Sequence, residues 1–249
     1  MEYEYWQWIW MAVAALIIGM SKCGIPGLGI LNVAILQNLL LAKQATGFGL
    51  PLLMVGDLCS LLIFRRHADW AQLRRLFPWT AGGVVLGYFA LGAISDSVAR
   101  ILIGFTLLAL LVLHFVRSRR KGEAEVVVNS FVAPIIGVMA GFVSMVANAA
   151  GPIMIIYLLA MRLPKMAFIG TSVVFFTCMN AFKLPFLIHL NLVTLESVAA
   201  NIRLTPLAIA GCVIGYFYAK KISQKYFEAF AFWLTVAAVL YMLRDVISL

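Results

Sequence analysis

Two short stretches that place glycine and proline at the start of a short apolar segment are the part of this sequence best suited to hold a small molecule. The first runs from Ser21 to Gly29 (SKCGIPGLG) and the second from Ser144 to Pro152 (SMVANAAGP). Each begins a short apolar segment, where proline fits the first helical turn and glycine lets a ligand approach the backbone. Two such helix N-termini would present unpaired N–H groups and positive dipole ends to an anion. The expected contacts, by backbone or cap, come from Gly24, Gly27, Gly29, Asn148, Ala149 and Gly151.

Ionisable and polar side chains inside apolar runs are the second indication of a site, because burying a charge in lipid is costly. Lys22 lies at the first tip, Asp57 deep in one apolar segment and Lys183 deep in another. The two lysines could attract an anion, and Asp57 could balance a charge or take a proton. Asn180 shares a helical side with Lys183 because the two are three residues apart. The alternative for Asp57 is a purely structural ion pair with a lysine. The alternative for the tip glycines is that they only allow tight helix packing.

The remaining polar residues add less. Thr171 and Ser172 are expected hydroxyl donors near the site, and Arg203 either lines an exit or snorkels to the interface. The three histidines are scattered without metal-ligand spacing, and no serine or cysteine nucleophile has a partnered base in sequence. The sequence therefore predicts a binding site with no metal, no cofactor and no enzyme activity.

Composition shows which elements must position these residues. Of 249 residues, 64% are hydrophobic and 12% charged, with a mean hydropathy of +1.01. A water-soluble domain cannot hide that much apolar surface, whereas a bilayer favours its exposure. The net charge of +9 comes mainly from short clusters between apolar runs, where cations orient membrane proteins, and it does not indicate a nucleic-acid partner.

Ten apolar segments are predicted, and the chain is expected to be all-α and polytopic. If every segment crosses, the basic clusters fall on one side, which the positive-inside rule makes cytoplasmic. Both termini then lie outside the cytoplasm. We expect the membrane to be the plasma (inner) membrane of a bacterium. The segments span roughly residues 6–20, 25–41, 45–64, 77–94, 99–116, 126–146, 149–161, 167–188, 198–218 and 227–247.

The sequence also contains an internal repeat. Pro78–Ser95 recurs as Pro206–Ser223 with eight of 18 positions identical, and upstream pairs such as Gly29 and Gly151 recur at a spacing of 122. Residues 1–121 and 122–249 then form two repeats of five segments, and an odd number inverts the second copy. The first two segments of each repeat are too short or too interrupted to cross, so we expect re-entrant or broken helical hairpins.

Short motifs spread over nearly the whole chain resemble those of a known family. They are Gly19–Gly29, Gly56–Leu58, Arg65–Trp70, Ala147–Pro152, Gly170–Ser172 and Asn180–Pro185. In them the chain resembles the sulfite exporter TauE/SafE family of membrane permeases. The resemblance implies a secondary transporter of sulfur-containing anions such as sulfite or sulfonates, usually moving them outward. Many members carry a denser glycine run at the first tip, which Pro26 and Leu28 interrupt here, so the substrate stays open.

The sequence thus predicts export of a small anion by alternating access, with one repeat rocking against the other in the lipid bilayer. An anion channel and an importer of the same substrates are the alternatives. The glycines at 82, 83 and 87 could pack helices within one chain or between two, which leaves a homodimer open.

Overall fold

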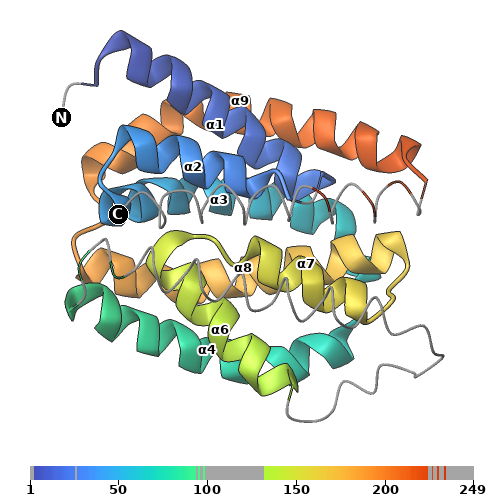
Figure 1. The fold of residues 1–249 in the computed structure, drawn as a ribbon. Helices are drawn as coiled ribbons and strands as arrows, with labels where there is room; N and C mark the ends of the chain where they lie inside the picture. The colour runs from blue at the N-terminus through green and yellow to red at the C-terminus, as the bar shows by residue number, and fades with distance from the viewer. Residues whose placement is uncertain are drawn as a thin grey trace.

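The computed structural model describes residues 3–25, 27–93 and 132–223, with single positions at 95, 98, 226, 229 and 233. Every regular element within these residues is a helix, so the all-α prediction is confirmed for this part of the chain (Figure 1). The elements are α1 (Tyr5–Cys23), α2 (Gly29–Leu39), α3 (Ala42–Phe64), the 3₁₀ turn η1 (Arg65–His67), α4 (Trp70–Ala93), α6 (Val132–Ala147), α7 (Gly151–Ala160), α8 (Lys165–His189) and α9 (Leu195–Lys221).

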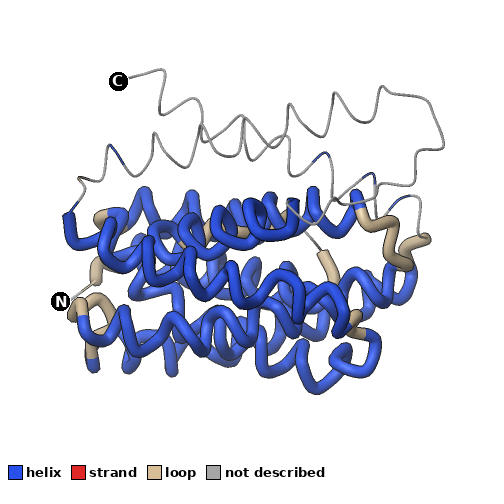
Figure 2. Tube along the Cα trace, turned by 90° about the horizontal axis from the view of Figure 1, so that it is seen from below, coloured by secondary structure: helices blue, strands red, loops and turns tan. Residues whose placement is uncertain are grey.

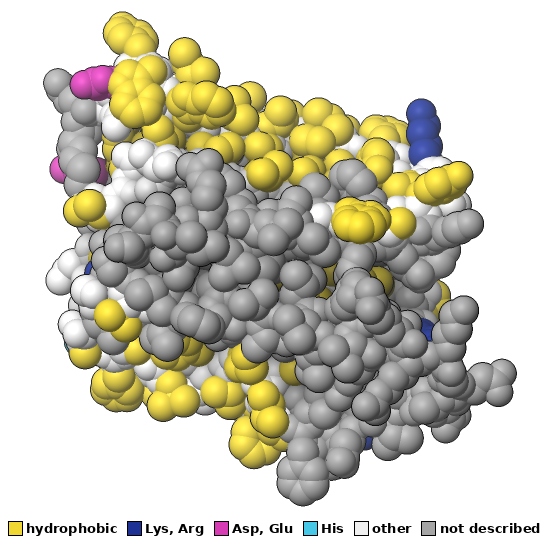
Figure 3. All heavy atoms as spheres, in the orientation of Figure 1, with side chains coloured by type: hydrophobic (Ala, Val, Ile, Leu, Met, Phe, Trp, Pro, Cys, Tyr) yellow, Lys and Arg dark blue, Asp and Glu magenta, His cyan; other side chains and the backbone are white. Residues whose placement is uncertain are grey.

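Eight of the ten predicted segments coincide with these helices. The predicted segments at 99–116 and 227–247 lie outside the described residues. Within the described residues, five helices are long and apolar enough to cross a membrane: Tyr5–Cys23, Lys43–His67, Trp70–Ala93, Lys165–His189 and Leu195–Lys221. Several large apolar side chains are exposed on each of α1, α3, α4 and α9, as expected for helices that face lipid, and Figure 3 shows many exposed apolar side chains on one face of the molecule.

The two helices expected to be short are short. α2 has 11 residues and α7 has 10, which at about 1.5 Å per residue is roughly half the ~30 Å hydrocarbon core. α2 packs back against α1 and α3, and α7 packs against α6 and α8. Each tip of interest is therefore the turn between a longer helix and a short one that reverses the chain.

Helices from the two halves of the chain pair with each other through glycine. α1 packs most extensively against α9, and α4 against α6. A Cβ placed on Gly19 would lie 1.9 Å from the carbonyl oxygen of Ala208, and one on Gly141 would lie 2.1 Å from that of Thr80. Gly19 and Gly141 are 122 residues apart, so the same backbone-to-backbone packing occurs twice.

The glycines singled out in α4 have different surroundings. Gly83 and Gly87 face α6, where an added Cβ would come within 2.1 Å of the Val138 carbonyl oxygen and 2.7 Å of Met145. Both are therefore used for packing within the chain. Gly82 is exposed and has no neighbouring atom within 4 Å of a Cβ.

The helices run roughly parallel to a common axis (Figures 1 and 2). Followed along the chain, α1, α3 and α9 run from left to right in Figure 1, whereas α4, α6 and α8 run from right to left. Helices at the repeat spacing, such as α1 and α6 or α3 and α8, thus run in opposite directions.

Charge separates along the same axis. Glu196 lies in the first turn of α9, and Lys220 and Lys221 lie in its last turn. Figure 3 shows the acidic groups of this face at the left end of the molecule and most of its basic groups towards the right. The basic turn η1 lies at the right end too, since a Cβ on Gly170, near the start of α8, would lie 2.8 Å from the Phe64 carbonyl oxygen. We refer to this right end as the basic end.

Candidate functional site

A cavity of about 110 Å³ lies where the two tips meet. One water needs about 10–15 Å³ on this measure, so the space suffices for a small polyatomic ion. Its walls come from the α1–α2 tip, the α6–α7 tip, Leu53 of α3 and seven residues of α8 between Phe168 and Asn180. Most of those α8 residues lie in the half of the helix nearer the basic end.

The structure brings most of the predicted site residues to this cavity. Nine of the twelve line it, whereas Asp57, Thr171 and Lys183 lie behind its wall. The nine are Lys22, Gly24, Gly27, Gly29, Asn148, Ala149, Gly151, Ser172 and Asn180.

The short helices point their N-termini at the cavity. α2 begins at Gly29 and α7 at Gly151, and both residues line it. In neither does a described side chain cap the first turn, and α7 has proline within that turn. By contrast, α9 is closed by a capping box, in which Thr194 accepts from the backbone N–H of Ser197. Uncapped N–H groups at two converging helix ends are suited to an anion.

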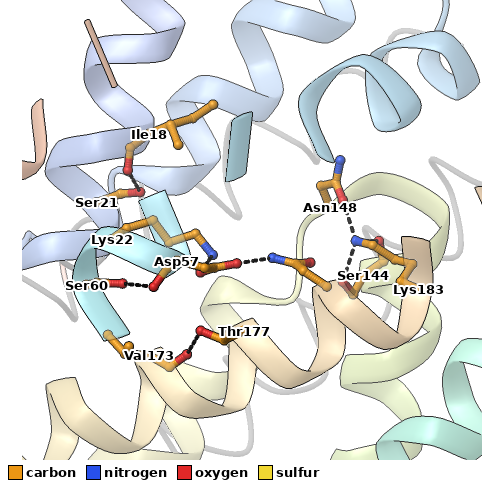
Figure 4. Close-up of polar contacts among 11 residues, drawn as sticks. Ile18, Ser21, Lys22, Asp57, Ser60, Ser144, Asn148, Val173, Thr177 and Lys183 are labelled. Carbon is orange, nitrogen blue, oxygen red and sulfur yellow. Dashed lines mark hydrogen bonds and ion pairs between the residues drawn. The ribbon is translucent and has the colours of Figure 1, made fainter. Parts of the chain in front are cut away.

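An ion pair holds the first tip. Lys22 Nζ lies 2.6 Å from Asp57 Oδ1, and Asn180 Nδ2 donates to Asp57 Oδ2 over 2.6 Å (Figure 4). Asp57 is 1% exposed, and the Lys22 ammonium also lies 4.6 Å from the centre of the Phe176 ring. A Cβ on Gly56 would lie 3.0 Å from Lys22 Cγ, so glycine makes room for the lysine stem. The structural pairing considered for Asp57 is therefore present, and it neutralises Lys22 at the cavity edge.

Backbone geometry shapes the first tip. Gly24 has a φ of 153°, and a Cβ there would lie 2.4 Å from the Gly215 carbonyl oxygen. Gly27 has a φ of 91°. Both conformations favour glycine, and Gly24 also seats the tip against α9.

A network of hydrogen bonds holds the second tip. Lys183 is 0% exposed, and its Nζ donates to Ser144 O and Oγ, both at 3.1 Å, and to Asn148 Oδ1 at 2.5 Å (Figure 4). Ser144 lies in the last turn of α6, where a cation stabilises the negative end of the helix dipole. The structure thus places Lys183 behind the second tip, in contact with Asn148, which lines the cavity.

Asn148 and Thr46 connect this tip to α3. Asn148 has a φ of 55°, the left-handed conformation that often ends a helix, and its backbone N–H donates to Ser144 O. Its Nδ2 donates to the Thr46 carbonyl oxygen over 2.8 Å, and Thr46 Oγ1 donates to Val146 O over 3.0 Å. Sequence reasoning missed Thr46, because a threonine in an apolar helix usually bonds to its own backbone.

Two other predicted residues lie elsewhere. Thr171 Oγ1 accepts from the backbone N–H of Asp69 over 2.8 Å, so it fixes the start of α4 against α8. Arg203 is exposed and lies over the Trp8 ring at 5.8 Å, consistent with the interfacial role considered for it. In the described ranges, no group of three His, Cys, Asp or Glu could hold a metal ion.

Comparison with known families shows which family the chain belongs to. The model described as sulfite exporter TauE/SafE matches residues 11–242, which is nearly the whole chain. The chain belongs to the TauE/SafE family. Its members are membrane transporters, in agreement with the five helices of the described ranges that are apolar and long enough to span a bilayer. No curated protein and no solved structure matches the chain. For this TauE/SafE protein, the resemblance in its tip motifs is confirmed, and those motifs line the cavity.

Proposed function

We propose that this TauE/SafE protein is a secondary transporter that exports small sulfur-containing anions, such as sulfite or sulfonates, from the cytoplasm. The observation that carries the proposal is the convergence of two uncapped helix N-termini, at Gly29 and Gly151, on one cavity. Their positions differ by the repeat spacing of 122, so the arrangement has a two-fold character. A sulfur oxyanion has several acceptor oxygens and could accept from both helices at once.

The charges around the cavity favour the same substrate class. Lys22 and Asp57 neutralise each other, whereas Lys183 hydrogen-bonds only to neutral oxygens among the contacts described. Two dipole ends and one buried cation therefore give the site a positive field. Asp57 would balance the charge of Lys22 between transport steps, and an arriving anion would compete with Asp57 for that ammonium.

Orientation follows from the basic end. If η1 and the end of α9 face the cytoplasm, as the positive-inside rule requires, the N-terminus lies outside, and the predicted segment 227–247, beyond the described residues, would take the C-terminus there too. The opposite directions of α1 and α6, and of α3 and α8, support an inverted repeat of 1–121 and 122–249. The cavity lining on α8 comes mainly from the cytoplasmic half of that helix, which suits loading from inside. An inside-negative potential then drives a monovalent anion outward by about 2.3 kcal/mol per 100 mV.

Binding measurements test the site before transport is considered. Purified protein would be titrated with sulfite, sulfate, taurine and acetate while thermal unfolding is followed, because a ligand that binds the folded state raises its apparent stability. We expect stabilisation by a sulfur anion that is lost in Lys22→Ala and weakened in Lys183→Ala. Lys220→Ala is the matched control, since Lys220 is exposed on α9 and lies over Tyr216. A folded protein that responds to none of the four anions would contradict the proposal.

An anion channel and an importer of the same anions remain the alternative functions. Reconstituted vesicles separate the carrier from the channel, because a carrier saturates and exchanges labelled substrate, whereas a channel gives large unitary currents. Vesicles of known orientation separate export from import.

A further inference from the structure

The start of α3 is bonded to the α6–α7 tip at the end of the site away from the basic end. Thr46 uses both its side chain and its carbonyl oxygen, which meet Val146 and Asn148, and Lys183 fixes Asn148 from the other side. Thr46 is 1% exposed. Contacts between residues about 100 positions apart, from different halves of the chain, close this end of the site. We call Thr46, Val146, Asn148 and Lys183 the latch.

The position equivalent to Thr46 in the second repeat lies on the wall of the main cavity. At a spacing of 122 it is Phe168, which lines the cavity together with its neighbour Ile169. Gly24 and Gly27 of the first tip line the same cavity. Towards the basic end, the open space thus lies between the first tip and α8, where the corresponding latch contact would form.

From this asymmetry we infer that the latch is the closed gate of the present state, and that Thr46 is the residue that positions it. In the alternate state the second tip leaves Thr46, and the first tip closes on Phe168 and Ile169. The site then opens away from the basic end. This inference rests on the proposed function, since only a transporter needs both states.

The packing shows which parts are free to move. Gly19 against Ala208 and Gly141 against Thr80 bring backbones into direct contact, and each contact joins helices of different repeats. Sliding one whole repeat past the other would disrupt both contacts, because interiors packed this closely do not deform continuously. Each hairpin therefore moves together with its partner helix: α1 and α2 with α9, and α6 and α7 with α4.

α3 carries a structural break beside the latch. Pro51 lies inside the helix, and its missing N–H removes the hydrogen bond to the carbonyl oxygen four residues earlier, at Gly47. Helices kink at such points. This break separates the segment that bears Thr46, whose Gly47 is seated against the Leu192 carbonyl oxygen, from the rest of α3.

Site-directed labelling in a background without the four native cysteines tests the latch. One reporter is Gln37→Cys, at a position that lines a small cavity of about 10 Å³ beside Thr46 and Asn148. The other is Ser172→Cys on the wall of the main cavity. A membrane-impermeant maleimide is added to either side of oriented vesicles, without substrate.

Thr46→Val keeps the shape of the side chain and removes its hydroxyl donor. Loss of one neutral hydrogen bond should shift the two states by about fivefold. Labelling of the Gln37→Cys reporter from the side away from the basic end should rise by that factor. Labelling of the Ser172→Cys reporter from the basic side should fall, and Thr46→Ser should restore the original rates.

Thr205→Val is the matched control. Thr205 Oγ1 donates to Asn201 O within its own helix over 2.9 Å, so the same chemical change breaks no contact between repeats. Both rates should stay unchanged in it. Unchanged rates in folded Thr46→Val would overturn the latch while leaving anion binding intact. If the labelling rates change in Thr46→Val but the protein binds no sulfur anion, the latch would be supported and only the proposed substrate would be contradicted.

Discussion

The two tips occupy corresponding places in the repeat and line the same cavity, but different chemistry anchors them. The α1–α2 tip depends on the buried ion pair between Lys22 and Asp57 and on Gly24 seated against α9. The α6–α7 tip depends on hydrogen bonds from Lys183 and Thr46 to neutral oxygens. The position equivalent to Lys22 is Ser144, so the charge that anchors each tip comes from a different element.

What the tips share is as informative as what separates them. Both place a glycine, Gly29 or Gly151, at the first position of a short helix that faces the cavity. This shared feature is the one an anion would use, because it supplies backbone N–H groups. The contacts that anchor the two tips can differ, because the anion does not use them. Since they do differ, the contacts that hold the two ends of the site closed are not equally strong in one state.

Breaking the ion pair should have the largest effect on stability. Asp57→Leu leaves Lys22 without its partner, and removal of one member of a buried pair costs about 3–5 kcal/mol. The Lys22 side chain stays 10% exposed at the cavity edge, which offsets part of this cost, so we expect a loss of about 2–3 kcal/mol in the free energy of unfolding. Chemical denaturation in detergent measures it.

The double variant Lys22→Leu with Asp57→Leu makes the comparison sharper. It removes both charges, so most of the lost stability should return. If the double variant is as unstable as the sum of the two single variants, the pair is not what anchors the first tip.

Gly24→Ala should be the next largest change. Its Cβ would lie 2.4 Å from the Gly215 carbonyl oxygen and 2.5 Å from Ala219 Cβ, at a φ of 153° that alanine rarely adopts. We expect a loss of about 1–3 kcal/mol, typical of strain and overpacking, measured by thermal unfolding. Gly82→Ala in α4 is the control, because its Cβ would meet nothing within 4 Å. Equal stability in the two variants would show that the first tip is not seated on α9.

The sequence predicted the segments and the tips because their signals are local. Apolar length marks a helix in lipid, and glycine with proline marks its break, so eight helices and nine cavity residues could be found in advance. The resemblance to the TauE/SafE family rests on the same local motifs, and the family match bears it out.

The contacts between elements could not be read in this way. Lys183 is a plausible ligand by its type, but whether it faces the cavity or the end of α6 depends on how α8 is rotated against α6. Thr46 gives no signal at all, since its partners lie 100 and 102 residues away. The pairing of α1 with α9 likewise depends on glycines. The sequence does not distinguish a glycine that packs helices from one that binds a ligand.

The smallest effect on stability should come from the feature that the tips share. A Cβ on Gly151 would meet no atom within 4 Å, and one on Gly29 would meet only Ser21, with its Oγ at 3.7 Å. Gly29→Ala and Gly151→Ala should therefore change the unfolding midpoint little, since alanine also favours a helix.

Each methyl group would project at a helix N-terminus on the cavity wall and hold an anion away from the backbone N–H groups. We expect sulfite affinity to fall by about tenfold in each variant, equivalent to about 1.4 kcal/mol, measured by the shift of thermal unfolding with sulfite concentration. Unchanged affinity in both would mean that the anion does not bind these helix ends, whereas a loss at one tip alone would show that binding is as asymmetric as the anchors.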